Sequence, residues 1–190
     1  MLLQKSEKYN AALMKSRIGK YSDNEFPANY SSIIGYGEGR MSVSEAKRIK
    51  WCRPEEVFKR PKVFDTIDPD DIVQGSLGDC YFLAAISSIA QHPRRLERIF
   101  LTKKLMKEGI YVMALCINGV WQEVVLDDYF PCQPYSKKPI FNSTKTDELW
   151  VMFLEKAWAK VHGGYMNINA GLTREALRDL TGASAKTFFT

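Results

Sequence analysis

One short segment of the sequence contains residues that could carry out chemistry. It reads Gln74-Gly75-Ser76-Leu77-Gly78-Asp79-Cys80 and leads into an apolar stretch that is predicted to be a helix. A thiol becomes an effective nucleophile when its thiolate is stabilised, and the free N–H groups and dipole of a helix N-terminus do this. Cys80 stands at that position, and the amide of Gln74 could donate beside the Cys80 N–H to an oxyanion. The pattern is typical of a cysteine nucleophile with an oxyanion hole.

The same segment also has a purely structural interpretation. Gly75 and Gly78 permit the close backbone approach that an oxyanion cradle requires, but they suit any tight turn equally well. Cys80 would then be a small residue packed at the start of a helix, with Asp79 as its N-cap. The spacing alone leaves both interpretations open.

The helix that must position Cys80 is predicted over residues 80–90, where apolar residues cover almost every face and His92-Pro93 ends the run. Two more helices are predicted over residues 148–162 and 173–182, the latter with Thr173 as its N-cap. Between them and the first helix, residues 111–117 and 121–126 form β-prone runs joined at Asn118-Gly119, which favours a tight hairpin turn. The sequence therefore predicts an α+β fold that is mainly helical.

The residues before the nucleophile segment give weaker signals. Residues 1–20 show a short helical pattern with Leu13, Met14 and Ile18 on one side, and residues 21–41 are predicted to be a loop. Ser42 and Glu45 have capping-box spacing, which predicts a helix from there to Pro54. Residues 59–79 contain two prolines, two glycines and several aspartates, and are predicted to form an irregular but ordered loop.

The composition excludes several classes of protein. With 190 residues, 45% of them hydrophobic, the chain can bury a core and is not disordered throughout. The net charge of +5 arises in residues 1–60, which hold 12 lysines and arginines against 7 acidic residues. No lysine-rich stripe with interleaved aromatic residues accompanies this excess, so we expect no nucleic-acid partner.

Neither a membrane span nor a secretory route is expected. No apolar run approaches the roughly 18 to 20 residues that cross a bilayer, and the N-terminus carries charges where a secretory signal would be apolar. The four cysteines, Cys52, Cys80, Cys116 and Cys132, include no C-x-x-C pair and indicate neither a zinc site nor a disulfide framework. These features favour a cytoplasmic, reducing location.

The nucleophile segment resembles the active-site motif of the calpain family of calcium-dependent cysteine proteases, Q-G-x-L-G-D-C-W-x-L-A-A. Only Tyr81 departs from it, because the family usually has Trp there. Five further matches follow the family's order along the chain, at residues 23–28, 51–54, 121–128, 154–160 and 181–183. The resemblance thus divides the chain into an N-terminal extension, residues 1–20, and a calpain-type catalytic domain, residues 21–190.

The resemblance implies a fold and roles for two residues. The fold would be the nucleophile-bearing half of a papain-like cysteine protease, the first subdomain of the calpain protease core. Cys80 matches the family's nucleophile and Gln74 its oxyanion-hole glutamine. The implied activity is that of a calcium-dependent cysteine endopeptidase that acts on protein substrates.

The resemblance also implies a calcium ion. Its side-chain ligands match Asp71 and Glu148, and its backbone-carbonyl ligands match Phe64 and Thr66, where Thr66 replaces the family's usual glycine. Hard oxygen ligands of this kind suit calcium. From the residues alone, the aspartates of residues 65–71 also read as a solvated acidic loop, and Glu148 as a first-turn residue favoured by the helix dipole.

A cysteine protease needs a histidine that accepts the thiol proton, and neither histidine of this sequence matches that role. In calpains the catalytic histidine and asparagine lie in a second subdomain, more than a hundred residues beyond the cysteine. His92 would lie roughly 18 Å along the helix from Cys80, and His162 ends the helix predicted over residues 148–162. Both are interpreted as helix-end groups. Pro69 also stands where the family often has an arginine that pairs with the second subdomain.

The expected function follows from these observations. The chain is predicted to be a calpain-like endopeptidase by family that is inactive alone, because the half bearing histidine and asparagine would have to come from elsewhere. A non-catalytic, calcium-responsive protein-binding module and a truncated calpain-like fragment are the alternatives. We also expect self-association, because a lone first subdomain would expose an apolar surface around Tyr81.

Overall fold

The computed structural model describes residues 7–16, 19–36 and 41–184. Its α-helices are α1 (Glu7–Lys15), α2 (Tyr30–Ile34), α3 (Val43–Ala46), α4 (Pro54–Val57), α5 (Cys80–Ala90), α6 (Pro93–Glu97), α7 (Trp150–Val161) and α8 (Thr173–Thr181). Its strands are β1 (Lys50–Cys52), β2 (Ile72–Val73), β3 (Ile110–Ile117), β4 (Val120–Asp127), β5 (Phe130–Cys132) and β6 (Ser143–Thr144). Two short 3₁₀ helices, η2 (Pro69–Asp71) and η3 (Tyr165–Ile168), complete the described elements. The fold mixes helices with strands, as the α+β prediction requires.

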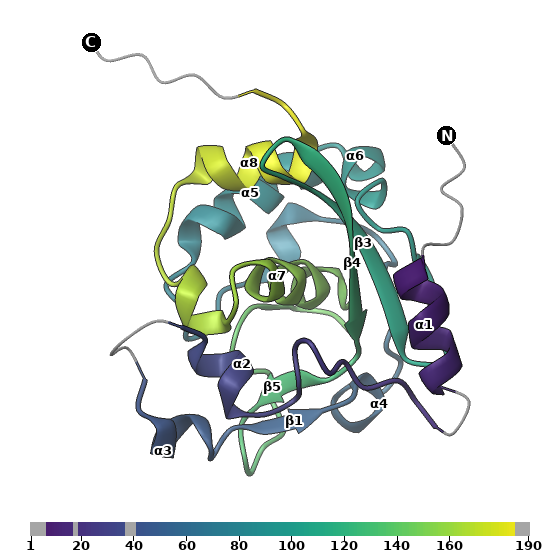
Figure 1. The fold of residues 1–190 in the computed structure, drawn as a ribbon. Helices are drawn as coiled ribbons and strands as arrows, with labels where there is room; N and C mark the ends of the chain where they lie inside the picture. The colour runs from purple at the N-terminus through teal and green to yellow at the C-terminus, as the bar shows by residue number, and fades with distance from the viewer. Residues whose placement is uncertain (1–6, 17–18, 37–40, 185–190) are drawn as a thin grey trace.

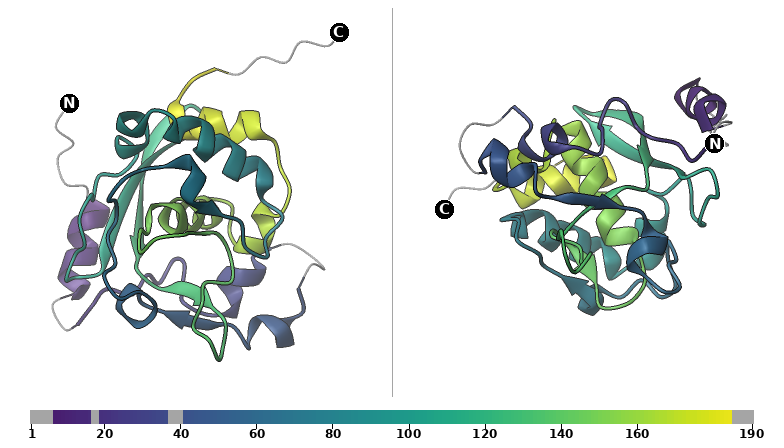
Figure 2. Two further views of the ribbon diagram at one scale, coloured as in Figure 1. Left: turned by 180° about the vertical axis from the view of Figure 1, so that it is seen from behind. Right: turned by 90° about the horizontal axis from the view of Figure 1, so that it is seen from below.

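Helix α7 lies at the centre of the molecule. The first ten of its twelve residues are buried, and the large side chains of Trp150, Phe153 and Trp158 are almost wholly enclosed. Helices α5 and α8 cover one side of α7, the β3–β4 hairpin covers a second, and the β1–β5 pair covers a third (Figures 1 and 2). A helix that is apolar on most of its faces has to be surrounded in this way.

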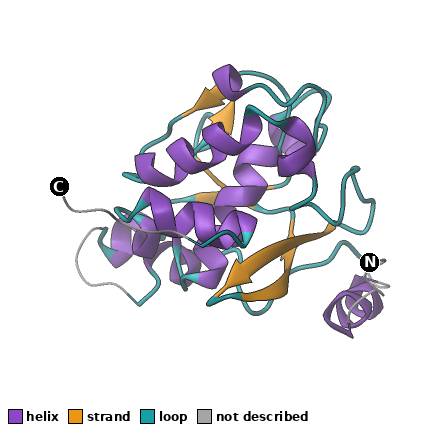
Figure 3. Ribbon diagram, turned by 90° about the horizontal axis from the view of Figure 1, so that it is seen from above, coloured by secondary structure: helices purple, strands orange, loops and turns teal. Residues whose placement is uncertain are grey.

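The strands form three separate antiparallel pairs, β1–β5, β2–β6 and β3–β4. The longest is the β3–β4 hairpin, which closes with Ile117 opposite Val120 at the turn where the sequence predicts one. Asn118 and Gly119 between them have φ angles of 52° and 79°, which a two-residue primed turn requires at both positions. Helix α1 packs on the hairpin, apart from the other helices (Figure 3).

The predicted helix from Ser42 to Pro54 is wrong beyond its first turn. The capping box between Ser42 and Glu45 is present, but α3 ends at Ala46. A turn follows, and Lys50–Cys52 form β1, because Trp51 lies opposite Pro131 of β5 and its ring packs near Tyr165. Tertiary pairing thus overrides the local helical signal, and Pro54 begins α4 instead of ending a helix.

Helices α2, α1 and α8 each differ in one detail from the sequence predictions. Helix α2 lies within residues 21–41, which were predicted to be a loop. On α1, Met14 is 57% exposed, and Ala12 is buried beside Leu13; Ile18 lies outside the described residues. Leu172 occupies the N-cap position of α8, so Thr173 is its first residue and not its cap.

Ion pairs with little exposed surface fix the hairpin and the segment before α2 to α7. The Nζ of Lys156, a residue with no exposed surface, donates to the Asp127 carboxylate and, over 3.1 Å, to the Asp127 carbonyl oxygen. One turn later, the Lys160 Nζ donates over 2.6 Å to the Asp23 carboxylate. The helices of the described residues are all too short or too polar to cross a lipid bilayer.

We expect Lys156→Ala to destabilise the protein by about 3–5 kcal/mol, because the substitution leaves the Asp127 carboxylate buried without its partner. Urea unfolding followed by circular dichroism would measure the loss. Lys103→Ala is the matched control, since Lys103 pairs with Glu97 over 3.4 Å on the surface with about half of its side chain exposed. That control should change stability by less than about 1 kcal/mol, and equal losses in the two variants would contradict the prediction.

Candidate active site

Cys80 is the first residue of α5, and its side chain is exposed. The other three cysteines, Cys52, Cys116 and Cys132, are free and buried. In the described part of the chain, the N–H groups of Cys80 and Tyr81 have no hydrogen-bond acceptor, because they belong to the unpaired first turn of the helix. The structure therefore presents an accessible thiol beside two free N–H donors, which is the arrangement that a nucleophile and an oxyanion require.

The residues that follow Cys80 pack against α7. The Phe82 ring stacks on the indole of Trp158, with ring centroids 5.3 Å apart, and Trp158 donates its Nε1–H to the Tyr81 hydroxyl over 3.0 Å. Tyr81, the departure from the family motif, thus uses its hydroxyl as an acceptor within the site. The residues on both sides of Cys80 are thus held by contacts, while the Cys80 side chain is exposed.

Gln74 lies on the loop that precedes α5, and its side chain is exposed. Its Nε2 donates over 3.2 Å to the Leu77 carbonyl oxygen. The amide that the sequence assigns to the oxyanion hole is therefore bonded within its own loop. Gly75 has no room for a side chain, since an added Cβ would lie 2.2 Å from the Phe141 carbonyl oxygen. The glycine is therefore required by close backbone approach.

The loop is held by two asparagines that the sequence analysis did not identify. The Gly75 N–H donates to Oδ1 of Asn142 over 3.0 Å, and the Gly78 N–H donates to Oδ1 of Asn169 over 2.9 Å. Asn142 is 1% exposed and lies in the segment between β5 and β6. An isolated asparagine in a connecting segment gives no signal in a single sequence, and only the fold brings it to the nucleophile loop.

Asp79 occupies the N-cap position of α5, but its side chain does not cap the helix. The carboxyl is wholly buried and its Oδ2 accepts from Nδ2 of Asn142 over 2.6 Å. Burial is the main cause that raises the pKa of Asp79 to about 6. The structural interpretation of Asp79 as a conventional N-cap is therefore wrong, and its carboxyl belongs to a buried polar cluster with Asn142 and Glu155.

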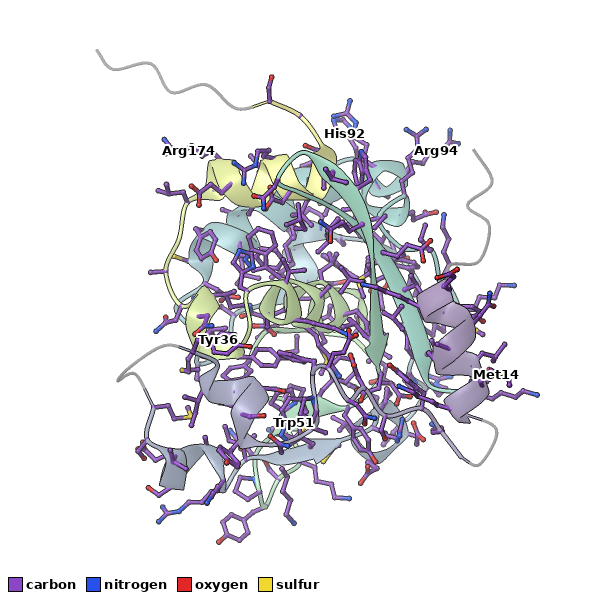
Figure 4. All side chains as sticks on the ribbon, viewed as in Figure 1. Met14, Tyr36, Trp51, His92, Arg94 and Arg174 are labelled. Atoms are coloured by element: carbon purple, nitrogen blue, oxygen red, sulfur yellow. The ribbon has the colours of Figure 1, made fainter. Side chains whose placement is uncertain are left out.

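Both histidines lie at helix ends, as the sequence analysis expects. His92 is the N-cap of α6, beyond the far end of α5, and its labelled side chain lies at the outer edge of the molecule (Figure 4). His162 is the C-cap of α7, where its Nδ1 lies 2.9 Å from the Trp158 carbonyl oxygen and its ring packs on the Trp158 indole. Neither ring makes a hydrogen bond to Cys80 in the described structure.

One contact brings Glu148, implied as a calcium ligand, to the loop that carries Phe64 and Thr66. Glu148 is 2% exposed, and its carboxylate accepts the N–H of Asp65, the residue between Phe64 and Thr66. The other Glu148 oxygen accepts the Thr146 hydroxyl over 3.1 Å. The loop that carries the two carbonyl candidates therefore lies against the Glu148 carboxylate.

The fourth candidate, Asp71, is tied to the same region by its backbone. Asp71 ends η2, directly before β2, and its carbonyl oxygen accepts the Lys145 N–H over 2.9 Å. The described residues hold no cluster of three or more His, Cys, Asp or Glu side chains that could bind a metal. However, Glu148 is a buried carboxylate that forms no ion pair with a described lysine or arginine, and its oxygens keep spare lone pairs. A carboxylate of this kind is a ligand that suits a hard cation.

Comparison with known proteins gives one consistent result. Residues 21–190 match the family model described as calpain family cysteine protease. The chain is 37% identical over 174 residues to the calpain-type cysteine protease DEK1 of Arabidopsis thaliana, covering 88% of this chain and 8% of that protein. It is 37% identical over 166 residues to the calpain-1 catalytic subunit of Rattus norvegicus, and 34% identical over 190 residues to calpain-12 of Homo sapiens. Those matches cover 85% and 98% of this chain but only 23% and 26% of the relatives.

We expect iodoacetamide to alkylate Cys80 about tenfold or more faster than any other cysteine of the folded chain, since reactivity requires an accessible thiol. Peptide mapping by mass spectrometry at several reaction times would give the four rates. In denaturant the four rates should converge, which serves as the control. A buried cysteine that reacts as fast as Cys80 in the folded chain would contradict the described site.

Proposed function

The chain belongs to the calpain family of cysteine proteases, and we propose on this basis that it carries the nucleophile of a calpain-type endopeptidase. The observation that supports the proposal best is the exposed Cys80 thiol at the start of α5, beside N–H groups without acceptors. We assign residues 21–190 to the first papain-like subdomain of the protease core and residues 1–20 to an extension. The chain spans about a quarter of the length of the animal calpains that it matches, so the activity of the whole protein is part of this proposal.

The proposed reaction is attack by the Cys80 sulfur on the carbonyl carbon of a peptide bond in a protein substrate. The carbonyl oxygen gains negative charge and is stabilised by the Cys80 N–H and by the Gln74 amide, which exchanges its bond to Leu77 for one to the oxyanion. The C–N bond then breaks, the amine leaves with a proton, and an acyl thioester forms on Cys80. Water hydrolyses the thioester and restores the thiol.

This sequence needs a group that removes the thiol proton and delivers one to the amine. We do not assign this role to either histidine of the chain, because His92 lies beyond the far end of α5 and the His162 ring lies against the Trp158 carbonyl of its own helix. We propose that a second subdomain bearing histidine and asparagine supplies the base and completes the cleft. We also propose that the surface which this partner would cover promotes self-association, and that the four free thiols reflect a reducing intracellular compartment.

We further propose calcium as the ion held by the Glu148 carboxylate, the Asp71 carboxylate and the carbonyl oxygens of Phe64 and Thr66. The support is the buried Glu148 carboxylate, which lacks a cationic partner among the described residues and lies against the loop that carries both carbonyls. The ion would offset that charge and tie the loop before η2 to the start of α7. A calcium-responsive binding module without turnover is the second candidate function, and the bond that holds Gln74 on the Leu77 carbonyl favours it.

We expect the isolated chain of 190 residues to show no detectable hydrolysis of a fluorogenic peptide, because no base accepts the Cys80 proton. The assay would include Cys80→Ser as the control for background. If the wild-type chain hydrolyses the peptide and Cys80→Ser does not, the chain supplies its own base from His92, His162 or a second copy. That result would overturn the assignment of the base to a second subdomain.

We expect calcium to raise the melting temperature of the chain. At about ten times Kd, mass action contributes about 1.4 kcal/mol, and a domain of this size then melts about 3 to 6 °C higher. Asp71→Ala and Glu148→Gln should abolish the rise. Asp70→Ala, at the exposed neighbour of Asp71, should keep it. A rise that persists unchanged in both ligand variants would place any calcium site elsewhere.

A further inference from the structure

Two carboxyl groups are buried against each other beneath the nucleophile. Asp79 precedes Cys80 and is 0% exposed, and Glu155 lies on the central helix α7 and is 2% exposed. Within the described part of the chain, neither carboxyl forms an ion pair with a lysine or arginine. Two buried carboxylates without a cation would repel each other and would also lose their hydration, so at least one of them must be neutral.

Asn142 connects this pair to the loop that carries Gln74. Its Nδ2 donates over 2.6 Å to Oδ2 of Asp79, and its backbone N–H donates over 3.3 Å to Oε1 of Glu155. Its Oδ1 accepts the Gly75 N–H over 3.0 Å. Asn142 therefore contacts the residue after Gln74 and the residue before Cys80 through its side chain, and the central helix through its backbone N–H.

One atom of the cluster shows where a proton must lie. Oδ1 of Asp79 is buried and accepts no hydrogen bond from any N–H or hydroxyl group of the described residues. The Glu155 carboxyl lies within hydrogen-bonding reach of Asp79. A proton on Glu155 satisfies Oδ1, because Glu155 then donates to Asp79 and the repulsion between the two groups disappears.

We propose that Asp79 and Glu155 share one proton and act, together with Asn142, as positioning residues that hold the Gln74 loop and Cys80 in their relative places. The inference rests on the proposed role of Cys80 as a nucleophile. The cluster touches no reacting atom. It fixes the loop that carries one oxyanion donor and the helix start that carries the other, and precise placement of such donors decides how well they stabilise an oxyanion.

The groups around the pair support this assignment. Tyr81 and Tyr165 face it from α5 and η3, and burial raises the pKa of both phenols, which are therefore neutral at pH 7. Burial is also the main cause that raises the pKa of Glu155, and the adjacent Asp79 raises it further. The directions of these shifts favour Glu155 as the position of the shared proton, and Asp79 takes up a second proton as the pH falls through about 6.

Infrared difference spectroscopy on the full chain tests the shared proton directly. We expect the carbonyl stretch of a protonated, buried carboxylic acid at pH 7 in the wild type and its loss in Glu155→Gln. Cys80→Ser, which changes the neighbouring residue only, should keep the band. A spectrum without this band at pH 7 would overturn the shared proton.

Amide hydrogen exchange tests the positioning role. We expect Asn142→Ala and Glu155→Ala to lower the protection of the Gly75 amide about tenfold or more, while the Ile86 amide inside α5 stays protected. Glu155→Gln should retain Gly75 protection, because its amide can donate to Oδ1 of Asp79 as the protonated acid does. If Glu155→Gln loosens the loop as much as Glu155→Ala, the donated hydrogen bond is not what positions it.

The pH dependence of stability gives a third, independent readout. The folded-state pKa of Asp79 lies above its ordinary value of 3.8, so the folded state binds the proton more tightly and stability is lost as pH rises from about 4 to about 6. The melting temperature of the wild type minus that of Asp79→Asn should therefore fall as the pH rises across this range. A difference that rises with pH would overturn the inference. None of the three readouts depends on peptide hydrolysis, so failure of the proposed function would be seen separately.

Discussion

The contact between the first turn of α5 and the buried helix α7 is the interaction on which the site depends. Phe82 stacks on Trp158, and Trp158 donates to the Tyr81 hydroxyl. About one turn before Trp158 on α7, the carboxyl of Glu155 interacts with that of Asp79. Cys80, which lies between these packed residues, is exposed. The first N–H groups of α5 have no intrahelical acceptors, so the packing that places the start of α5 also places the proposed nucleophile beside its proposed oxyanion donors.

The rest of the fold keeps α7 in place. The hairpin is fixed to it through Lys156 and Asp127, the segment before α2 through Lys160 and Asp23, and the loop before α5 through Asn142. The proposed calcium ligand Glu148 precedes the first residue of α7 by two residues. An ion at Glu148 would therefore hold the start of α7. Because the first turn of α5 packs against α7, calcium could in this way influence the position of Cys80.

The sequence predicted the elements whose signals are local. The apolar run after Cys80, the Asn118-Gly119 turn and the helical spacing around Trp158 all produced their elements within a few residues. The sequence predictions were wrong where tertiary contacts determine the local structure. Strand β1 replaces part of a predicted helix because Trp51 pairs with β5. The Asp79 side chain accepts a hydrogen bond from Asn142 and does not cap α5. The polar cluster could not be read from spacing, because its members are 63 and 13 residues apart and meet only in the folded chain.

The central claim is that Cys80 and Gln74 form half of an active site. The rate at which an activated ester acylates Cys80 tests this most directly, because its leaving group needs no acid and the reaction still develops an oxyanion. We predict that Gln74→Ala slows acylation on the order of 10²-fold while leaving iodoacetamide alkylation of Cys80, which forms no oxyanion, unchanged. Equal rates of acylation in wild type and Gln74→Ala, or an equal loss in both reactions, would contradict the account.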